Sequence, residues 1–450
     1  MKKNIVIFYT DDQGTVDAGC YGSDDLKTPA LDKLAKEGVR FTQAYAHSVC
    51  CPSRAALLTG RYPQRGGVNH WMSNRADFDH QGNMYKDEIT IAQVLKNKGY
   101  KTAMFGKWHL GAKEGHRPND FGFDEFFGIR CGFIENYEHK FMHDVPFHDL
   151  YENEEEIFRD GEYFPDMVTD RAKKFLEENT ENGFFLYLPY NLPHFPYQAD
   201  MKYVDEYNHL PMPRSKYAPV VATIDDRIGQ VMDKIDELGL REDTLIIYMS
   251  DNGHDASWFE DKEGRQYGPW GGGGSAGEWT GYKMTFYEGG IRVPCIMSMP
   301  GVVPKGEVRD QLITNMDFMP TICNFLEIPL PQVKLDGYDI WDIIKSDDAI
   351  SRYDNKLYYQ FEKNWMVRDG DWKLLSGNWN KLSASKEIEL VNLNDEKPET
   401  INHAKEHPEI VDKMLKMHRD WYYDVFNDSC YYTSKRGLDY RNGDNDRQKI

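Results

Sequence analysis

The chain has 450 residues, of which 40% are hydrophobic and 14% aromatic. This length and composition favour a globular protein of two or three lobes with a large core, and they argue against disorder. The formal net charge is −20, and without a basic cluster the sequence does not suggest a nucleic-acid partner. The seven cysteines are odd in number and include no C-x-x-C pair, which argues against a disulfide framework or a zinc knuckle.

No stretch of the sequence approaches the length of a membrane span, so no membrane partner is expected. The first three residues (MKK) are similar to the start of a signal peptide. However, the apolar run at residues 5–9 is too short for one, and two aspartates follow it at once. As written, the chain is therefore expected to be cytoplasmic. It would be periplasmic or secreted if a leader had been removed.

Predicted strands and helices alternate along most of the chain. Buried strands are predicted at residues 4–10, 101–105, 184–189, 244–249 and 295–299, with a short extended run at 40–45. Helices are predicted at residues 28–36, 88–98, 167–179 and 217–238. This alternation is typical of an α/β fold in which a large, mostly parallel sheet is sandwiched by helices.

The pattern changes after residue 301. A helix is predicted at residues 315–326 and a turn at 336–338. Short antiparallel strands are predicted at residues 356–361, 365–368, 372–375 and 387–393, and a final helix at 408–425. We therefore expect two domains, an α/β domain at residues 1–340 and a smaller α+β subdomain with an antiparallel sheet at residues 341–450.

The string VCCPSRAALLTGR at residues 49–61 contains a C-x-P-x-R pattern. Arg54 is four residues after Cys50, so both side chains project from one face near the start of the predicted helix. Exposed N–H groups at a helix start and a fixed guanidinium both favour anions. The pattern specifies only three positions, and by itself a buried thiol ahead of an ordinary helix would explain it.

Oxygen-bearing side chains follow two of the predicted strands. Asp11 and Asp12 come after the strand at residues 4–10, and Asp251 and Asn252 come after the strand at 244–249. Ligands of open α/β sheets bind at the carboxyl ends of the strands, where these two pairs could meet. Hard oxygen ligands favour Ca²⁺ or Mg²⁺ over zinc. Alone, an aspartate pair after a strand is more often a turn or a helix cap.

Three further motifs place positive charge or imidazole groups past strand ends. Lys107 and His109 are two residues apart in GKWHLG, and on an extended segment they point the same way. His194 lies between two prolines in NLPHFP, which restrains its backbone. Lys283 stands ahead of YEGGIRVP. Each motif also fits an ordinary role, such as an exposed lysine or a histidine in a rigid loop.

In this order, DDQG, CCPSR, GKWHLG, PHFP, SDNG and the lysine ahead of YEGGIRVP resemble the sulfatase branch of the alkaline-phosphatase-like superfamily. The resemblance covers residues 4–300, and VRDGDWKLL from Val367 is similar to the family's C-terminal lobe. Type I sulfatases oxidise the first cysteine of the signature to formylglycine. The resemblance therefore implies this modification at Cys50, made by a formylglycine-generating or sulfatase-maturing enzyme. The departures are small: Cys51 fills the variable slot, and Val391 stands where a tyrosine is usual.

The resemblance also implies a cofactor and roles for the site residues. Ca²⁺, or Mg²⁺, would be held by Asp11, Asp12, Asp251, Asn252 and modified Cys50. The roles implied for the basic side chains are as follows: Arg54 and Lys107 stabilise the formylglycine and the charge beside the metal, His109 acts on its hydroxyl, and His194 and Lys283 grip the sulfate and protonate the leaving oxygen. Lys107 is also counted among the substrate-binding residues. A hydrated aldehyde carries two hydroxyls on one carbon, so one attacks sulfur and the other, once deprotonated, expels sulfate.

Three segments interrupt the α/β pattern, at residues 62–87, 126–166 and 253–282. Each follows a catalytic motif directly or after a short stretch, so each should border the pocket. Their aromatic and polar side chains suit the faces and hydroxyls of a sugar: Asn69, His70, Trp71, Arg75, His139, His143, Trp258, Trp270 and Trp279. His70 and Trp71 are the candidates for substrate binding. A walled pocket favours an exo-acting carbohydrate O-sulfatase, although any single tryptophan more often just pins a loop.

Two alternatives stay open. A phosphate or phosphonate monoester hydrolase of the same superfamily generally uses Thr or Ser with two metals, or a formylglycine with a different outer shell. A second metal would need additional His and Asp ligands, and no convincing set stands in the sequence. A catalytically silent sugar-binding homologue would have lost at least one charged motif member, yet all are present.

Overall fold

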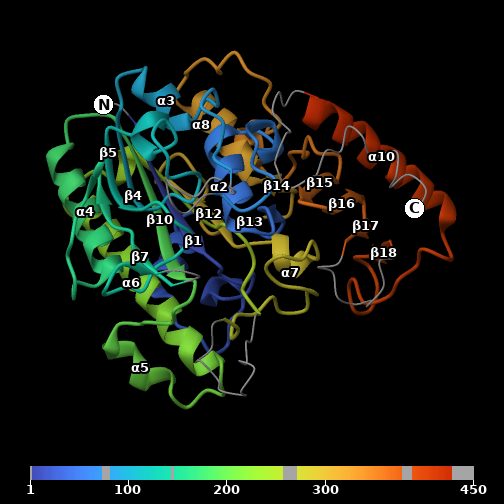
Figure 1. The fold of residues 1–450 in the computed structure, drawn as a ribbon, viewed down its shortest axis with the longest axis horizontal. Helices are drawn as coiled ribbons and strands as arrows, with labels where there is room; N and C mark the ends of the chain where they lie inside the picture. The colour runs from blue at the N-terminus through green and yellow to red at the C-terminus, as the bar shows by residue number, and fades with distance from the viewer. Residues whose placement is uncertain (1–2, 73–81, 143–145, 257–270, 378–387, 428–450) are drawn as a thin grey trace.

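The computed structural model describes residues 3–72, 82–142, 146–256, 271–377 and 388–427 (Figure 1). Within them, a ten-stranded sheet has the order β13-β2-β12-β11-β1-β10-β4-β5-β8-β9. In that order the strands are Glu307–Arg309, Val39–Phe41, Cys295–Ser298, Thr244–Ser250, Asn4–Asp11, Phe184–Pro193, Lys101–Lys107, Glu125–Ile129, Tyr151–Glu152 and Glu155–Glu156. The predicted α/β fold with a large, mostly parallel sheet is confirmed.

The middle of this sheet is parallel. β1 pairs in parallel with β10 and β11, β10 with β4, and β4 with β5. The sheet becomes mixed toward its edges, because β12 runs antiparallel to both β11 and β2, and β8 runs antiparallel to β5. The carboxyl ends of β1, β4, β10 and β11 therefore lie at the same edge of the sheet, as the motif positions require.

The alternation of side chains along β1 explains why the sheet has helices on both faces. Ile5, Ile7 and Tyr9 belong to one core cluster, whereas Val6 and Phe8 belong to the cluster on the opposite face. The first cluster includes residues of α2 (Cys50–Thr59), α3 (Ile91–Lys96), α8 (Phe318–Phe325) and α9 (Trp341–Lys345). The second includes residues of α1 (Pro29–Lys36), α4 (Phe164–Glu178) and α6 (Arg214–Glu237). Figure 1 shows this layered arrangement.

Several element boundaries differ from the predicted ones. α3 is shorter than residues 88–98 because Thr90 caps it, accepting a hydrogen bond from the backbone of Gln93. Residues 40–45 divide between β2 and a second short strand, β3 (Ala44–Tyr45). The segment 126–166, expected to be irregular, contributes strands β5, β8 and β9 to the main sheet. A helix that was not predicted, α5 (Met201–Tyr207), begins after its capping residue Asp200.

The C-terminal region forms the predicted antiparallel sheet. β15 (Lys356–Phe361), β16 (Asn364–Asp369), β17 (Trp372–Ser376) and β18 (Glu389–Asn392) pair in sequence order. One face packs against α10 (Pro408–Asn427), with Met414 in the shared core. The other face packs against residues of the main body, among them Tyr45 and Phe286. The division of the chain at residue 340 stays a prediction.

Buried charges join the C-terminal sheet to the main body. Lys373 of β17 forms ion pairs with Glu288 at 3.0 Å and with Glu399 at 2.6 Å, and all three side chains are inaccessible to solvent. Glu288 opens α7 (Glu288–Ile291) and also accepts a hydrogen bond from the Tyr45 hydroxyl. These contacts cross between residues on both sides of position 340.

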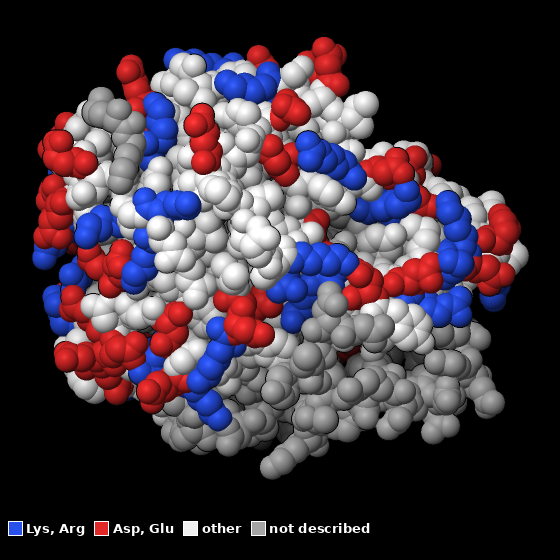
Figure 2. All heavy atoms as spheres, turned by 90° about the horizontal axis from the view of Figure 1, so that it is seen from above, with Lys and Arg blue, Asp and Glu red and all other residues white. Residues whose placement is uncertain are grey.

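The outer surface carries both signs of charge. On the face in Figure 2, Lys and Arg side chains are interspersed with Asp and Glu, and the coloured residues form no continuous basic surface. In the parts of the chain that the structure describes, no helix combines the length and the apolar character needed to cross a membrane.

Candidate active site

The site lies where the parallel strands end. Asp11 is the last residue of β1, Lys107 is the last residue of β4, Asp251 follows β11 and His194 follows β10. Ligand atoms of Asp11, Asp12, Cys50 and Asp251 all lie within 4.8 Å of one another, and the four residues are buried. The two oxygen-bearing pairs and the signature cysteine, far apart in sequence, therefore meet at one edge of the sheet.

Helix α2 brings Cys50 into this cluster. The helix begins at Cys50 itself, after the extended residue Val49, and ends at Gly60, which adopts a left-handed conformation (φ 66°) that suits glycine. The Cys50 Sγ lies 3.4 Å from Asp11 Oδ1. Ser53 fixes the helix in place, because its carbonyl and hydroxyl oxygens accept hydrogen bonds from Asn315 Nδ2 at 2.8 and 3.0 Å. The N-terminus of α2 is thus directed at the acidic cluster.

Three buried cationic side chains neutralise the three carboxylates. Lys107 Nζ donates to Asp11 at 2.6 Å, and Lys283 Nζ donates to Asp12 at 2.7 Å. Arg54 donates to Asp251 Oδ2 from both Nε and a terminal nitrogen, at 3.1 and 2.7 Å. Arg54, Lys107 and the carboxylates are almost inaccessible, whereas Lys283 retains 5% exposure. The carboxylates therefore do not need a metal for charge neutrality alone.

Asn252 supplies the observation that favours a metal. Its Nδ2 donates to Asp12 Oδ1 at 2.7 Å and to the Gly253 carbonyl at 2.9 Å. Among the described residues its Oδ1 is buried and has no hydrogen-bond partner. An unpartnered buried oxygen costs about 1–3 kcal/mol. With three carboxylates beside it, this oxygen completes a donor set that fits Ca²⁺ or Mg²⁺.

Two histidines lie beside these charged residues, and each is 5% exposed. His194 Nδ1 donates to the Phe195 carbonyl at 2.6 Å, so its Nε2 faces the cluster, 3.5 Å from Asp12 Oδ2. His109 has a positive φ of 56°, and its Nδ1 is buried without a partner in the described chain. Positive φ is uncommon for a residue with a side chain, although histidine is among the types that adopt it more often than most.

Burial and charge shift the pKa values of the site in consistent directions. Burial raises the pKa of Asp12 to about 7, with Lys283 opposing and Asp11 reinforcing the shift. Burial, together with the neighbouring cations, holds the pKa of His109 and of His194 well below the usual range. Burial also raises the pKa of the Cys50 thiol well above its usual value. An unmodified Cys50 would therefore be a protonated thiol, which is a weak nucleophile.

The residues expected to line a sugar pocket divide into separate groups. Trp71 stacks on His109, with ring centroids 6.2 Å apart and planes at 19°, and His70 Nδ1 donates to the Trp71 carbonyl. Asn69 instead contacts the C-terminal sheet through the Glu362 carbonyl. The other members of that set are placed as follows: Trp279 covers the Arg292 guanidinium at 4.2 Å, His139 belongs to a different cluster, and Arg75, His143, Trp258 and Trp270 lie outside the described residues.

Sequence reasoning missed residues that hold the site from behind. Phe133 stacks on His194, with ring centroids 5.1 Å apart, and the Arg54 guanidinium lies over the Tyr9 ring. Asn315, which fixes α2, stands at the start of the predicted helix at residues 315–326. A polar residue there could have suggested a cap, but nothing in the local pattern indicated its contact with Ser53.

The comparisons with known proteins agree with this geometry. Residues 3–328 match the Sulfatase family, and residues 277–422 match the family described as N-sulphoglucosamine sulphohydrolase, C-terminal. The chain belongs to the sulfatase family. The resemblance expected from the motifs is thereby confirmed, and this is a family of sulfuric ester hydrolases.

Sulfatases with curated sequences cover most of this chain. Arylsulfatase J of Mus musculus is 34% identical over 361 residues, which are 78% of this chain and 57% of that protein. N-acetylgalactosamine-6-sulfatase of Rattus norvegicus is 32% identical over 368 residues, which are 78% of this chain and 67% of that protein. The chain thus matches a little over half to two thirds of the length of these two relatives.

Solved structures extend the similarity over nearly the whole chain. The structure titled Ps i-CgsB in complex with k-i-k-neocarrahexaose has a TM-score of 0.82 and 27% sequence identity. The similarity covers 98% of this chain and 97% of that one. The mixed central sheet and the C-terminal antiparallel sheet are therefore both part of the sulfatase architecture.

Proposed function

We propose that this protein hydrolyses sulfate monoesters of carbohydrates, acting at chain ends, with a formylglycine made from Cys50 and a bound Ca²⁺. The observation that carries the proposal is the position of Cys50. Its sulfur lies at the N-terminus of α2, 3.4 Å from Asp11, within a cluster of three carboxylates paired with three cations. A buried thiol without a chemical role behaves as a small apolar side chain and packs best among apolar neighbours. The six charged groups around Cys50 therefore favour a functional role for this residue.

Four oxygen-bearing residues are proposed to hold the metal: Asp11, Asp12, Asp251 and Asn252. Ca²⁺ takes six to eight oxygen ligands, and the unpartnered Asn252 Oδ1 fits as one of them. Mg²⁺ is the second choice, because it demands a more regular octahedron. A bound dication would polarise a sulfate oxygen and give the neutralised cluster a net positive charge, which favours an anionic substrate.

The chain's own side chains are proposed to handle charge and protons. Arg54 is rigidly held by Asp251 and the Lys107 carbonyl, so its guanidinium is preorganised beside position 50. Lys107 is held on the same side of position 50 by its hydrogen bond to Asp11. Their fixed positive charges would stabilise negative charge on an oxygen at position 50 without reorganisation. A hydrated aldehyde there would supply one hydroxyl to attack sulfur and a second to release sulfate.

His109, His194 and Lys283 are proposed to meet the substrate, because they are the site's cationic or imidazole side chains that keep some solvent exposure. Lys283 supplies an ammonium group for a sulfate oxygen. His194 presents Nε2 toward the same space, with its ring fixed by the Phe195 carbonyl and by Phe133. That orientation suits proton transfer to the leaving oxygen, while His109 acts on the hydroxyl of position 50.

A sugar sulfate is the proposed substrate class. The partly exposed Trp71 lies beside His109 and offers an aromatic surface at the entrance to the site. The names of similar proteins agree with this class, since one is an N-acetylgalactosamine-6-sulfatase and another was solved with a neocarrahexaose. The small exposure of the three substrate-facing residues favours a terminal sulfate over one in the middle of a polymer.

The alternatives have less support. A two-metal phosphatase would need a second group of ligands beside the first, and within the described residues no further His, Cys, Asp or Glu side chain joins the Asp11 cluster. A catalytically silent sugar-binding protein would not require the buried ion pairs around Cys50. All five cationic and imidazole members of the motifs lie at the cluster: Arg54, Lys107, His109, His194 and Lys283.

Maturation is proposed to precede folding. Cys50 is 1% exposed and is the first residue of a fully buried helix, so an enzyme cannot reach its sulfur in the folded protein. The partner is therefore a formylglycine-generating or sulfatase-maturing enzyme that acts on the unfolded segment. This partner and the aldehyde are both part of the proposal.

Mass spectrometry of the peptide containing Cys50, combined with sulfate release from a sulfated sugar, tests the function. Active protein should show the loss of mass expected when the thiol becomes an aldehyde. Cys50→Ala should abolish sulfate release while circular dichroism stays unchanged. Cys51→Ala is the matched control, because Cys51 is also buried in α2 but belongs to the apolar core. Equal loss of activity in both variants would contradict the proposal.

A further inference from the structure

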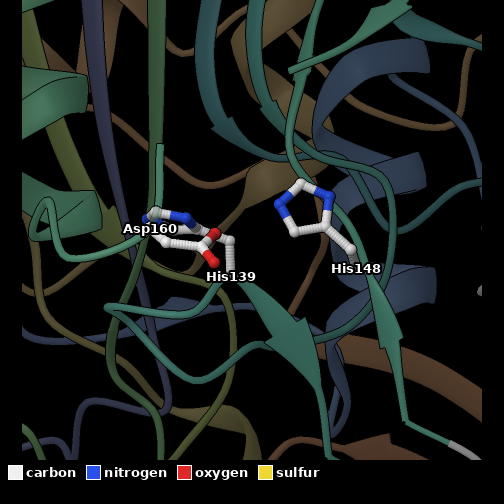
Figure 3. A group of neighbouring side chains, drawn as sticks. All are labelled: His139, His148 and Asp160. Carbon is white, nitrogen blue, oxygen red and sulfur yellow. The ribbon is translucent and has the colours of Figure 1, made fainter. Parts of the chain in front are cut away.

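A second group of possible metal ligands lies in the segment between β5 and α4. It consists of His139, His148 and Asp160, and one ligand atom from each lies within 4.8 Å of the others (Figure 3). His139 precedes the short strand β6 (Lys140–Phe141), and His148 ends its partner β7 (Phe147–His148). Asp160 comes from the loop that leads to α4. The three residues thus join a hairpin to a separate loop.

The outer nitrogen of each imidazole is already occupied. His139 Nε2 donates to the Glu162 carbonyl at 3.0 Å, and His148 Nδ1 donates to the Glu156 carboxylate at 2.9 Å. These bonds fix the tautomer of each ring and leave a lone pair on the other nitrogen. Metal-binding histidines in proteins almost always have this arrangement, with the second nitrogen donating to a carbonyl or a carboxylate.

The inner nitrogens have no partner. His139 Nδ1 and His148 Nε2 are both buried, and neither has a hydrogen-bond partner within the described parts of the chain. His139 is fully inaccessible to solvent, and the two rings stand at 90° with centroids 6.2 Å apart. Figure 3 shows a ring nitrogen of His148 directed toward His139 and Asp160. Two buried lone pairs without donors are costly unless something binds them.

We propose that His139, His148 and Asp160 bind one divalent transition metal of the zinc type. Two imidazoles and a carboxylate suit Zn²⁺, whereas Ca²⁺ takes oxygen ligands. Asp160 is exposed, so its carboxylate can rotate to complete the ligand set around the two fixed histidines. A water molecule fills the fourth position of a tetrahedral site. This site is built from different residues and ligand atoms than the all-oxygen cluster at Asp11.

The metal serves a structural purpose. Phe158 stacks on His148 with centroids 4.3 Å apart, although its own side chain is largely exposed. β6 and β7 are two residues each, too short to hold the hairpin alone. A metal would tie this hairpin to the loop at Asp160. The same segment carries Phe133, which stacks on His194, so the metal stabilises the support of an active-site histidine.

Zinc binding to the full chain, produced without a histidine tag, tests the inference. The protein is stripped with a chelator, reloaded with excess Ca²⁺ to fill oxygen sites, and titrated with ZnCl₂ against a coloured chelator. We expect about one zinc per chain and a rise in Tm on addition of zinc. X-ray absorption should then show two imidazole nitrogens at the zinc. Wild-type protein that takes up no zinc would overturn the inference and leave an ordinary buried water as the occupant.

Variants separate ligation from folding. The double variant His139→Gln with His148→Gln should lose the zinc and the rise in Tm. Asp160→Asn is exposed and should fold normally while weakening zinc binding tenfold or more. His403→Gln is the control, because His403 is also hydrogen-bonded to carboxylates, Asp395 and Glu406, but belongs to no such cluster in the described chain. Zinc affinity that is unchanged in the double variant and in Asp160→Asn would also overturn the inference.

Discussion

Trp71 lies almost flat against His109, with ring centroids 6.2 Å apart and planes inclined by 19°. The other side of this contact is fixed from the C-terminal sheet, where Phe361 of β15 meets the Trp71 ring edge-on at 5.4 Å. Trp71 therefore links the C-terminal sheet to the active site. This arrangement orients the indole from behind and leaves part of it exposed.

Trp71→Ala should reduce kcat/KM for a sulfated mono- or disaccharide by about tenfold, equivalent to ~1.4 kcal/mol, because the sugar loses an aromatic surface. A small aryl sulfate should lose much less, since it does not reach this surface. Steady-state kinetics with both substrates measure the ratio. Trp71→Phe should recover part of the loss for the sugar.

Trp372→Ala provides the matched control, because Trp372 also lies against a histidine, His403, but in the C-terminal sheet. Its ratio of sugar to aryl activity should equal that of the wild type. A uniform loss with both substrates in Trp71→Ala would show that Trp71 only supports His109. The proposed sugar contact would then be wrong.

Asn252→Ala should weaken Ca²⁺ binding and leave the fold intact. The substitution removes the unpartnered Oδ1 but also the Nδ2 bond to Asp12. Calcium stabilises the folded state by RT ln(1 + [Ca²⁺]/Kd), so a tenfold weaker site lowers the stabilisation by ~1.4 kcal/mol at saturating calcium. Calorimetric melting with calcium and with a chelator measures the difference.

Asn4→Ala is the control for this experiment. Asn4 is a buried asparagine at the opposite end of β1, and its Oδ1 accepts a bond from the Phe184 backbone. This variant should be less stable than the wild type by the same amount with and without calcium. A wild-type protein that holds no divalent metal and keeps full activity would refute the proposed calcium site.

His47 should make the protein less stable as the pH falls below 6.5. Burial lowers the pKa of His47 to about 3, while the Gln360 carbonyl, which accepts its Nε2 proton at 3.0 Å, opposes the shift. In the unfolded chain His47 binds a proton near pH 6.5, whereas in the folded chain it stays neutral down to about pH 3. Unfolding therefore takes up a proton in this window, and His47 costs about 1.4 kcal/mol of stability per pH unit.

His47→Gln keeps a donor for Gln360 and removes the titration. The free energy of unfolding, measured in urea at pH 7 and pH 5, should fall less between these two pH values in this variant than in the wild type, by about 2 kcal/mol. Other groups cancel in this comparison because both proteins carry them. His209→Gln, at an exposed histidine, should behave like the wild type. Equal pH dependence of all three proteins would show that His47 is protonated in the folded state.

Strand and helix patterns predicted the central architecture because they depend on the local amino-acid sequence. The strand at residues 4–10 is apolar throughout, as a strand buried on both faces must be, and the structure places it at the middle of the sheet. The partners of short strands depend on distant contacts instead. β2 pairs with β12 and β13, which follow it by more than two hundred residues, and no local pattern specifies such a pairing.

The acidic cluster could be predicted for the same reason, since parallel strands bring their carboxyl ends to one edge. The close pairing of each carboxylate with its own cation could not, because Lys283 reaches Asp12 from a loop with no regular structure. The position of His139 differs from the expected one. This residue was expected to line the sugar pocket, yet its ring hydrogen-bonds to the Glu162 carbonyl in the cluster with His148 and Asp160.

The buried pairs between Lys373 and the two glutamates bear on how the molecule can be divided. A chain ended at residue 340 would leave Glu288 in the interior without its lysine, and loss of one partner from a buried ion pair costs about 3–5 kcal/mol. That is a large part of the stability of a typical domain. The residues before and after position 340 are thus expected to unfold in one transition, and neither part is a suitable fragment for separate expression.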